Sequence, residues 1–566
     1  MILALTGVPL VIVSIIAFIF ILGLIIVVHE GGHFFFAKKA GILCHEFSIG
    51  MGPAVYKKKF GETLFCIRAI PIGGYVSMAG EGVTDGLVEK GRKIGINLLD
   101  NKISEIILDE NLDAQITGEI VDFDLYGENG NPLFITINDG FQEFYYEVLE
   151  DAFYVLKKDS KLQLAPYHRS FESKSILQRF LTLVAGAGMN FVLAIIIYLL
   201  VSFVTGVPNY DSSVIGEVSL GNTDMLVEVD GNVTTLIQPG DQIIEINGEK
   251  INNWNDLSSV TDSFVTNSNP TVNMKVIRNE EELSLTFDCY TYIASLGISN
   301  IQYEKKELPA GLTNGLIVGN VGMNYLDQYA KPKYELAYGD VITHVQIDVV
   351  NANGTIVEGT PVELISWAQM IELFKDINVA NVRFRYYSYE KNDFVEIADC
   401  ETFQTYGDEL LENQRIEKIQ VKIGISPETK FSFFGCIGEA FKAFWNDFTL
   451  IFRTLGILIA PQSGFRQVGV NDLSSFVGIF DIVMSYISAG ILPLLSFAAL
   501  LSVNIGVMNL LPIPALDGGR VVFLVYELIT KKKPSKKVEN IINNVFFILL
   551  MVLFVYITFN DIFRLI

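Results

Sequence analysis

An uncharged apolar stretch opens the chain and leads into a pair of histidines. Residues 1–28 contain no Asp, Glu, Lys or Arg, and most of them are Ile, Leu, Val, Phe or Ala. About 20 such residues span the hydrocarbon core of a bilayer, so this stretch predicts a transmembrane helix. It continues through V-V-H-E-G-G-H at residues 27–33, and the first lysines after it are Lys38 and Lys39. At 1.5 Å per residue His29 is about 14 Å before Lys38, which predicts that the histidines lie inside the membrane near one surface.

Residues 29–33 form an H-E-x-x-H motif. On a helix His29 and His33 are one turn apart on the same face, and both rings can reach one Zn²⁺ at about 2.0–2.1 Å. Glu30 lies on a neighbouring face and suits a general base that acts on a metal-bound water. The motif also arises by chance, and a buried histidine is more often a satisfied core residue than a ligand. Ionisable residues inside a membrane helix are costly and usually functional, which favours the metal site.

Composition limits the class of protein. The chain has 566 residues, of which 50% are hydrophobic, and a mean hydropathy of +0.38, which indicates a few spans joined to sizeable soluble parts. A net charge of −23 argues against nucleic acid as a partner. The five cysteines are widely spaced and form no C-x-x-C pair, so neither a zinc–thiolate site nor a disulfide framework is indicated. The N-terminus lacks a basic region and a cleavage site, which favours a retained span.

Further motifs follow in a fixed order. They are F-S-I-G-M-G-P at 47–53, R-A-I-P-I-G-G-Y-V at 68–76, A-G-A-G-M-N-F at 185–191 and N-L-L-P-I-P-A-L-D-G-G at 509–519. Together with H-E-x-x-H they resemble the site-2 protease family of intramembrane zinc metalloproteases, in its bacterial RseP-like branch. Two segments depart from the family pattern. Ala187 replaces a proline, and Ser475 and Phe476 alter the family's L-S-G-P-V-G-I-F within residues 473–480.

The last of these motifs supplies a candidate third ligand. Pro512 and Pro514 must break the preceding helix, and broken backbone at membrane depth is tolerated where it lines a cavity. Asp517 follows them and completes a set of three protein ligands, although an Asp before two glycines is often only a turn residue.

The resemblance also implies substrate contacts. It implies that Asn509 and the Gly73-Gly74 segment hold the substrate as an extended strand. Asn190 lies within a predicted span, where its side chain must hydrogen-bond inward, and we include it among the expected substrate-binding residues.

The soluble region carries a second resemblance. P-G-D-Q-I-I-E-I-N-G at 239–248 resembles the P-G-D-x-I-x-x-I-N-G element of PDZ domains, and alternating residues at 272–287 suit its last strands. The G-D-x-I element recurs at 339–342. We therefore expect two PDZ-like domains, the second diverged, which bind extended peptides or only block access sterically.

Residues 81–165 are acid-rich and contain no recognisable chemistry. Alternating residues at 116–123 and 133–137 flank a Gly/Asn turn, which predicts a β-hairpin within a lineage-specific insertion or small β module.

The predicted fold is a polytopic α-helical membrane protein with about four spans, extracytoplasmic PDZ-like β-rich domains and a cytoplasmic β-containing insertion. The spans are expected at about 9–36, 180–205, 486–511 and 541–558. The predicted segments are 1–80 (first span, H-E-x-x-H motif and membrane-associated β segment), 81–165 (acidic insertion), 166–207 (second span), 208–300 and 301–430 (PDZ-like domains), 431–482 (amphipathic surface helix and linker) and 483–566 (third and fourth spans).

Lysines predict the topology. Lys38, Lys39, Lys57–Lys59 and the lysines of 531–537 flank the spans on one side, which should be cytoplasmic. Both termini and the PDZ-like region are then extracytoplasmic, and the zinc site lies toward the cytoplasmic side of the cell membrane.

The expected function is regulated intramembrane proteolysis with Zn²⁺ as cofactor. The substrate would be a single-pass membrane protein in the lipid bilayer, such as an anti-sigma factor or a signal-peptide remnant. One alternative is a catalytically silent PDZ-bearing membrane scaffold, which predicts a missing ligand or base. Another is a transporter or metal channel, which predicts internal repeats and charged pairs across several spans. The sequence has neither signature.

Overall fold

The computed structural model describes residues 8–80, 87–109, 111–157, 160–218, 226–229, 232–300, 308–319, 336–350, 355–400, 402–405, 417–459 and 476–565. The chain separates into two compact units. The helical unit comprises 1–201, 438–452 and 474–566, and the strand-rich unit comprises 202–437 and 453–473. Segment 473–475 of the altered family motif lies outside the described residues.

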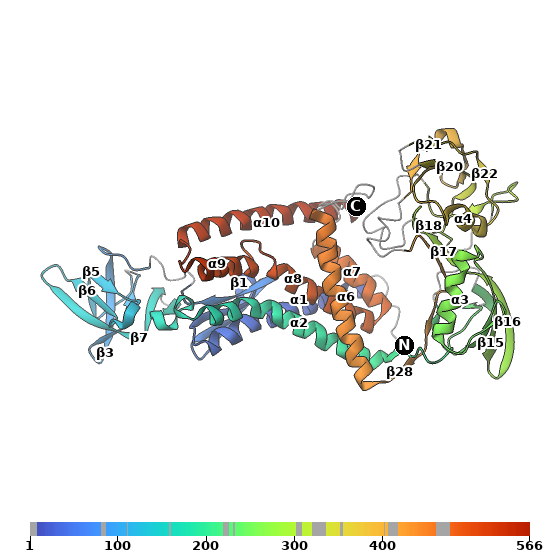
Figure 1. Cartoon of the computed structure of the whole chain (residues 1–566). Helices are drawn as coiled ribbons and strands as arrows, with labels where there is room; N and C mark the ends of the chain where they lie inside the picture. Colours follow the sequence, from blue (N-terminus) through green and yellow to red (C-terminus); the bar gives the residue numbers. More distant parts are fainter. Residues whose placement is uncertain are drawn as a thin grey trace. The chain divides into compact units, whose positions relative to one another are not determined.

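Four helices of the described chain are long and apolar enough to cross a membrane, which confirms the expected number (Figure 1). They are α1 (Val8–Lys39), α2 (Ile176–Thr205), α8 (Ile491–Leu510) and α10 (Lys536–Leu565). The start predicted for the third span is wrong. Gly490, at φ 121°, ends the preceding helix α7 (Phe476–Ala489), and Pro493 lies in the first turn of α8, where a missing N–H is tolerated.

Helix α6 (Phe433–Ile459) matches the predicted amphipathic segment and is not one of those four helices. Phe444 and Phe448 meet the ring of Phe191 on α2 edge-on, at centroid distances of 5.7 and 5.9 Å. Tyr198 of α2 donates a hydrogen bond to Asp447 of α6. The middle of α6 is therefore part of the helical unit.

The segment between α8 and α9 (Asp517–Thr530) is a tightly packed run of bends and turns. Leu511 ends α8 in a β conformation and Ala515 adopts φ 75°. A Cβ on Gly518 would lie 2.2 Å from the carbonyl oxygen of Leu511, and one on Gly519 would lie 2.5 Å from that of Ile513. The two glycines therefore let the first turn of α9 rest on the broken segment, which places Asp517 at a helix N-terminus.

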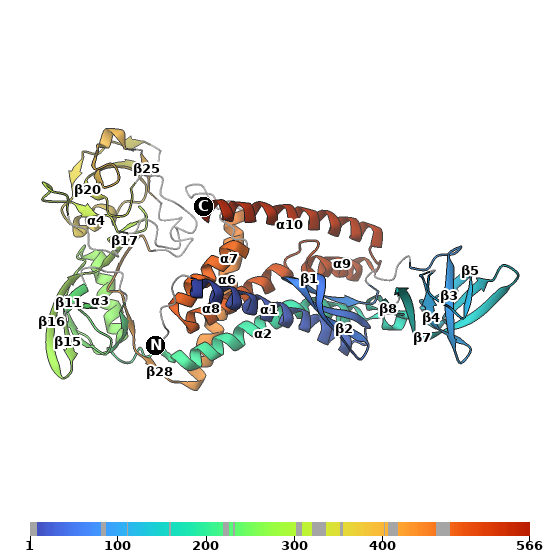
Figure 2. The same cartoon turned by 180° about the vertical axis from the view of Figure 1, so that it is seen from behind.

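Between α1 and α2 the chain first forms a twisted hairpin of β1 (Cys44–Phe60) and β2 (Thr63–Met78), seen from both sides in Figures 1 and 2. Residues 44–49 of β1 pair with 74–78 on one side and with 64–67 on the other. The hairpin thus makes a small sheet in which the segment 73–78 is an outer strand, and no described strand pairs with its other side.

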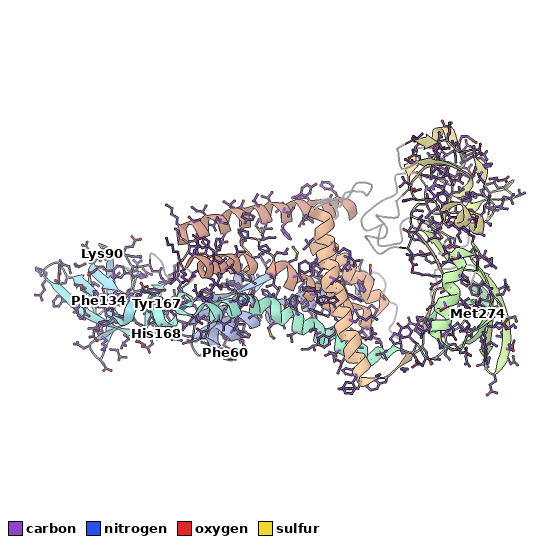
Figure 3. The ribbon with its side chains drawn as sticks, viewed as in Figure 1. Phe60, Lys90, Phe134, Tyr167, His168 and Met274 are labelled. Carbon is purple, nitrogen blue, oxygen red and sulfur yellow. The ribbon has the colours of Figure 1, made fainter. Side chains whose placement is uncertain are left out.

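The predicted insertion is an ordered β module. Its strands are β3 (Lys93–Leu99), β4 (Lys102–Ile107), β5 (Ile116–Asp124), β6 (Phe134–Asn138), β7 (Glu143–Lys157) and β8 (Ser160–Gln163). The expected hairpin is β5–β6. An additional parallel pairing of β4 with β7 closes the five strands from β3 through β7 into a ring around a buried core. Short 3-10 turns follow it at Tyr167–Arg169 and Phe171–Ser173, and Figure 3 labels Phe134 on the module and Tyr167 where the chain leaves it.

The strand-rich unit contains two main sheets, each with a helix. The first has the order β14-β13-β15-β16 with α3, and the second has the path β19-β20-β23-β24 with α4, joined by β21, β22 and β25. Asn253 caps α3 and Ser366 caps α4 with their side chains. One continuous core contains residues of both sheets, and β26 pairs with β17 although more than a hundred residues separate them along the chain.

Bounds of the elements in this unit are β9 (Val207–Pro208), β10 (Ile215–Val218), β11 (Leu226–Val229), β12 (Asn232–Thr235), β13 (Gln242–Ile246), β14 (Glu249–Lys250), α3 (Trp254–Thr266), β15 (Thr271–Arg278), β16 (Glu281–Asp288), β17 (Tyr290–Ile293), β18 (Ile298–Ser299), β19 (Leu316–Ile317), β20 (Val341–Val350), β21 (Ile356–Val357), β22 (Val362–Glu363), α4 (Trp367–Phe374), β23 (Ala380–Ser388), β24 (Asp393–Val395), β25 (Phe403–Gln404), β26 (Ile419–Lys422), β27 (Ile425–Pro427) and β28 (Thr429–Lys430).

Candidate metal centre

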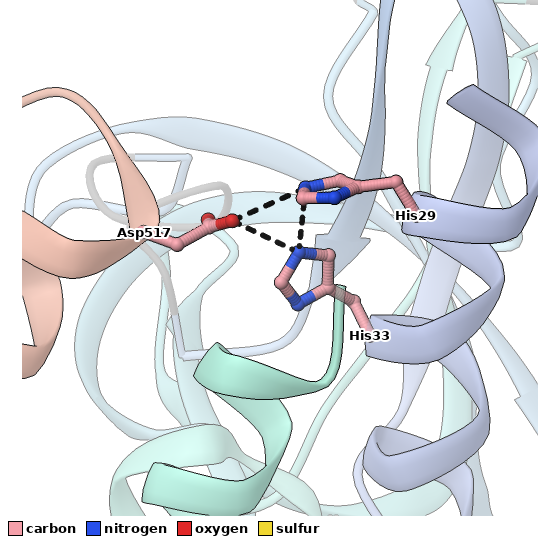
Figure 4. A group of neighbouring side chains, drawn as sticks. All are labelled: His29, His33 and Asp517. Carbon is pink, nitrogen blue, oxygen red and sulfur yellow. Dashed lines mark hydrogen bonds and ion pairs between the residues drawn. The ribbon is translucent and has the colours of Figure 1, made fainter. Parts of the chain in front are cut away.

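Three side chains from the two ends of the chain converge in the helical unit (Figure 4). His29 and His33 project from α1 toward Asp517 on α9. The Nε2 atoms of both rings lie 3.2 Å from Asp517 Oδ2 and 3.3 Å from each other. Both histidines are buried.

The spacing of these three atoms fits a tetrahedral metal site. Ligands at 2.0–2.1 Å from a tetrahedral Zn²⁺ are about 3.3 Å apart, which the observed distances match. The donor set is the imidazole and carboxylate chemistry that zinc accepts. When both Nε2 atoms are unprotonated, they and the carboxylate oxygen repel one another unless a cation lies between them, so the residues fit the ion.

The ring orientation of His33 is set by a main-chain carbonyl. His33 Nδ1 lies 2.7 Å from the carbonyl oxygen of Thr182 on α2. A carbonyl can only accept, so Nδ1 carries the proton and Nε2 of the neutral ring presents its lone pair toward Asp517. Such an outer hydrogen bond is typical of metal-binding histidines.

Gly186 of α2 lies directly against both rings. A Cβ added there would lie 2.3 Å from His33 Nε2 and 2.8 Å from both Nε2 and Cε1 of His29. On α1, Gly32 next to His33 leaves similar room for α2, since its added Cβ would lie 2.4 Å from the carbonyl oxygen of Ala185. The small residues therefore bring α2 into contact with the pair of histidines.

A cavity of about 710 Å³ opens onto the three side chains. Its lining includes Glu30 beside the histidines, Gly73 and Gly74 on β2, and Asn509 near the end of α8. These are four of the residues that we expected to act on the substrate. Asn190, the fifth, is fully buried and does not line this cavity; its amide nitrogen lies 3.3 Å from His29 Nδ1.

The outer strand of the hairpin touches α1 at Gly74. A Cβ on Gly74 would lie 2.9 Å from Glu30 Cγ, 2.9 Å from Ile26 Cγ2 and 2.8 Å from the carbonyl oxygen of Ser48. Only glycine lets the backbone of an outer strand lie this close to Glu30.

A polar cluster holds this outer strand to its neighbours. Arg68 donates to Ser48 Oγ at 2.8 Å, to Glu46 Oε1 at 2.5 Å and to the Tyr75 hydroxyl at 2.7 Å. Tyr75 in turn donates to Glu46 at 2.8 Å. Burial and the Glu46 carboxylate raise the pKa of the Tyr75 phenol, so it remains a donor.

The turn between β1 and β2 is held to the end of α1 and to the segment that follows the insertion. Glu62 accepts hydrogen bonds from Lys38 and, at 2.6 Å, from Arg169. Burial opposes ionisation of Glu62, but these two cations outweigh it and lower its pKa. His45 is buried nearby, and burial together with Arg169 lowers its pKa to about 4, against a smaller opposite effect of Glu62.

A buried ion pair joins α2 to α9. Arg179 donates to both carboxylate oxygens of Glu527, at 2.7 and 2.9 Å, and the two side chains are 9% and 13% exposed. This pair therefore ties the helix that carries Gly186 to the helix that carries Asp517.

Comparison with known proteins assigns the family. Residues 17–553 match Peptidase family M50. The chain belongs to this family. A Staphylococcus aureus (strain N315) protein, SA1105, is 30% identical over 560 residues, 98% of both chains. The zinc metalloproteases RasP of Shouchella clausii and Bacillus licheniformis are 29% and 28% identical over 98% of this chain and 99% of each relative. The protein is thus a site-2 type zinc metalloprotease and a membrane protein.

Several residues that shape this M50 site were not predicted from sequence. Thr182 acts through its main chain, which no pattern of side chains reveals. Gly186 and Arg68 lie inside motifs that we recognised, but only the packing shows what they contact. Arg179 and Glu527 are far apart in sequence, and the one available signal was that Arg179 is the single charged residue of the apolar helix α2.

Proposed function

We propose that His29, His33 and Asp517 hold the zinc ion, and that Glu30 is the general base. The reaction is hydrolysis of a peptide bond within or next to the transmembrane segment of a membrane protein. The observation that supports this most directly is the mutual spacing of 3.2–3.3 Å among three ligand atoms from α1 and α9, beside a cavity that Glu30 also lines.

Bound zinc polarises a carbonyl and lowers the pKa of water. The residues of the chain supply the rest of the chemistry. The Glu30 carboxylate takes the proton of the attacking water and gives it to the departing amine, so one residue serves both steps. The Gly74 backbone lies against Glu30, so a substrate strand that pairs with this backbone passes close to the Glu30 carboxylate.

The outer strand 73–78 is the proposed substrate-binding edge. Its free main-chain groups can pair with an extended peptide, which is a general mode of peptide recognition. Asn509 also lines the cavity and offers donors and an acceptor to the same peptide. A transmembrane helix must therefore unwind over a few residues before it is cleaved, because a helical backbone has no groups to spare for pairing.

The experiment separates the ligands from the base. Glu30→Gln should keep one equivalent of zinc and lose proteolysis of a transmembrane reporter, because the amide cannot accept the proton. Asp517→Ala should lose most of the zinc and the activity together. Zinc retained at one equivalent with normal cleavage in Asp517→Ala would place the third ligand elsewhere.

The alternative scaffold function is not favoured, since the chain belongs to a peptidase family and has a complete candidate set of ligands and base. A Glu30→Gln protein that cleaves at more than a few per cent of the wild-type rate would remove Glu30 from the mechanism while leaving the metal site intact.

We also propose that the strand-rich unit carries two PDZ-like domains on the extracytoplasmic side, with the metal centre toward the cytoplasm. The distribution of lysines supports this orientation. Single cysteines at positions 35 and 534, in a chain without other cysteines, should react with an impermeant thiol reagent from the cytoplasmic side, and one at 300 from outside. Reaction of all three from one side would refute the topology.

The PDZ-like domains are proposed to restrict which substrates reach the metal. None of the proposed ligands, base or strand-edge residues lies within 210–428. A chain lacking 210–428 should therefore bind zinc and cleave a wider range of reporters. A folded, zinc-loaded deletion that cleaves nothing would show that the region is needed for catalysis itself.

A further inference from the structure

One face of α2 contacts the back of the metal centre at three successive turns. Thr182, Gly186 and Asn190 are four residues apart, so they lie on the same side of the helix. The carbonyl oxygen of Thr182 accepts a hydrogen bond from His33, and the missing side chain of Gly186 leaves room for both rings. The amide nitrogen of Asn190 lies 3.3 Å from Nδ1 of His29. The two histidines thus each have an outer partner on the same helix.

The main chain of Asn190 also contacts α8. Its main-chain oxygen accepts a hydrogen bond of 2.8 Å from Ser502 Oγ on α8. Asn190 is fully buried, and its Oδ1 has no hydrogen-bond partner when the amide nitrogen faces His29. Leaving a buried amide oxygen without a hydrogen-bond donor costs free energy, which argues against this orientation of the amide.

The two ends of an amide are distinguished only by their hydrogen bonds. If the amide nitrogen donated to Nδ1, neutral His29 would carry its proton on Nε2, facing Asp517, and could not bind a cation through that atom. If Oδ1 faces the ring instead, it accepts from Nδ1–H, and the Nε2 lone pair is directed at Asp517 as in His33. The second arrangement also gives the orphaned oxygen a donor.

We infer that Asn190 is a positioning residue for the metal, which accepts a hydrogen bond from His29 Nδ1–H through Oδ1 and so fixes the tautomer and orientation of that ring. This inference rests on the proposed ligand set. It replaces the substrate-binding role expected for Asn190, because the residue does not line the cavity.

The test is the affinity of the full-length protein in detergent for zinc, measured by competition with a chromogenic chelator. Asn190→Leu keeps the size of the side chain but cannot accept, so zinc should bind 10- to 100-fold more weakly, as is usual for lost outer partners of metal ligands. Asn190→Asp can only accept, so its affinity should stay within about threefold of wild type or increase. Ser502→Ala is the matched control, since it removes the contact behind Asn190 but leaves the amide, and its zinc affinity should not change.

Two results would overturn the inference. One is an Asn190→Leu protein that binds zinc within about twofold of wild type, and a raised KM in that protein would then restore the substrate-binding role. The other is an Asn190→Asp protein that loses affinity tenfold while its metal-free form melts at the wild-type temperature, because this would show the amide nitrogen donating to His29. If Asn190→Leu does not fold, the zinc affinity of Asn190→Asp by itself tests the inference.

Failure of the inference is distinguishable from failure of the proposed function. The zinc affinity of Asp517→Ala is measured in parallel. If Asp517→Ala loses zinc while Asn190→Leu binds zinc as wild type does, the proposed ligands are supported and only the role of Asn190 is rejected.

Discussion

Gly186→Ala is the substitution whose consequence for the metal centre can be worked out from distances. The added methyl group would lie 2.3 Å from His33 Nε2 and 2.8 Å from His29 Nε2. Non-bonded atoms of this kind are comfortable at about 3.5 Å, so the His33 ring or α2 must shift by about 1 Å. Functional metal sites tolerate ligand displacements of only about 0.2 Å. We therefore expect zinc affinity to fall by at least 100-fold and proteolysis to fall with it.

The matched control is Gly188→Ala, two residues further along the same helix. A Cβ at Gly188 would meet no atom within 4 Å. Both substitutions raise the helix propensity of α2 by about 1 kcal/mol, so a difference between them reports the contact with the rings rather than the helix.

The assay combines zinc content after gel filtration with cleavage of a transmembrane reporter, and the melting temperature of the metal-free protein shows whether the fold survives. Gly188→Ala should match wild type in all three measurements. A Gly186→Ala protein with one equivalent of zinc and normal cleavage would refute the reasoning, because it would mean that α2 does not lie against the histidines.

Two further predictions follow from charged groups. Replacing Glu527 alone with Leu leaves Arg179 buried and unpaired, which should cost about 3–5 kcal/mol in stability; the double replacement by Leu should recover most of it, and equal melting temperatures for single and double variants would contradict this. Burial lowers the pKa of His45 to about 4 from 6.5, so the folded protein keeps this ring neutral while the unfolded chain binds a proton. Stability should therefore be full above pH 6.5 and decline by up to about 3 kcal/mol as the pH falls toward 4. His45→Phe should remove this part of the decline in a thermal titration, and an unchanged pH profile would show that other groups cause it.

The sequence was informative where function requires a particular side chain. H-E-x-x-H and the Asp517 segment carry their chemistry in residue type and spacing, and the structure brings them together at 3.2 Å across 488 residues. The four apolar helices could be predicted because burial in lipid demands length and composition alone.

Other features depend on three-dimensional packing that no local pattern encodes. Asn190 was recognisable as a polar residue in a span, but its partner could have been a substrate or another side chain. The closure of the β module needs β4 and β7 to pair in parallel, which is a long-range contact. The start of α8 was predicted too early because the apolar composition continues through Gly490, whose φ of 121° interrupts the helix.

The separation of the proposed ligands along the chain also determines when the enzyme becomes active. His29 precedes Asp517 by 488 residues, and ribosomes add about 5–20 residues per second. For roughly 25 to 100 seconds of synthesis the membrane therefore holds α1 with both histidines and Glu30 but without Asp517, the proposed third ligand. During that interval the nascent protein lacks a complete metal centre and cannot cleave the membrane proteins inserted beside it.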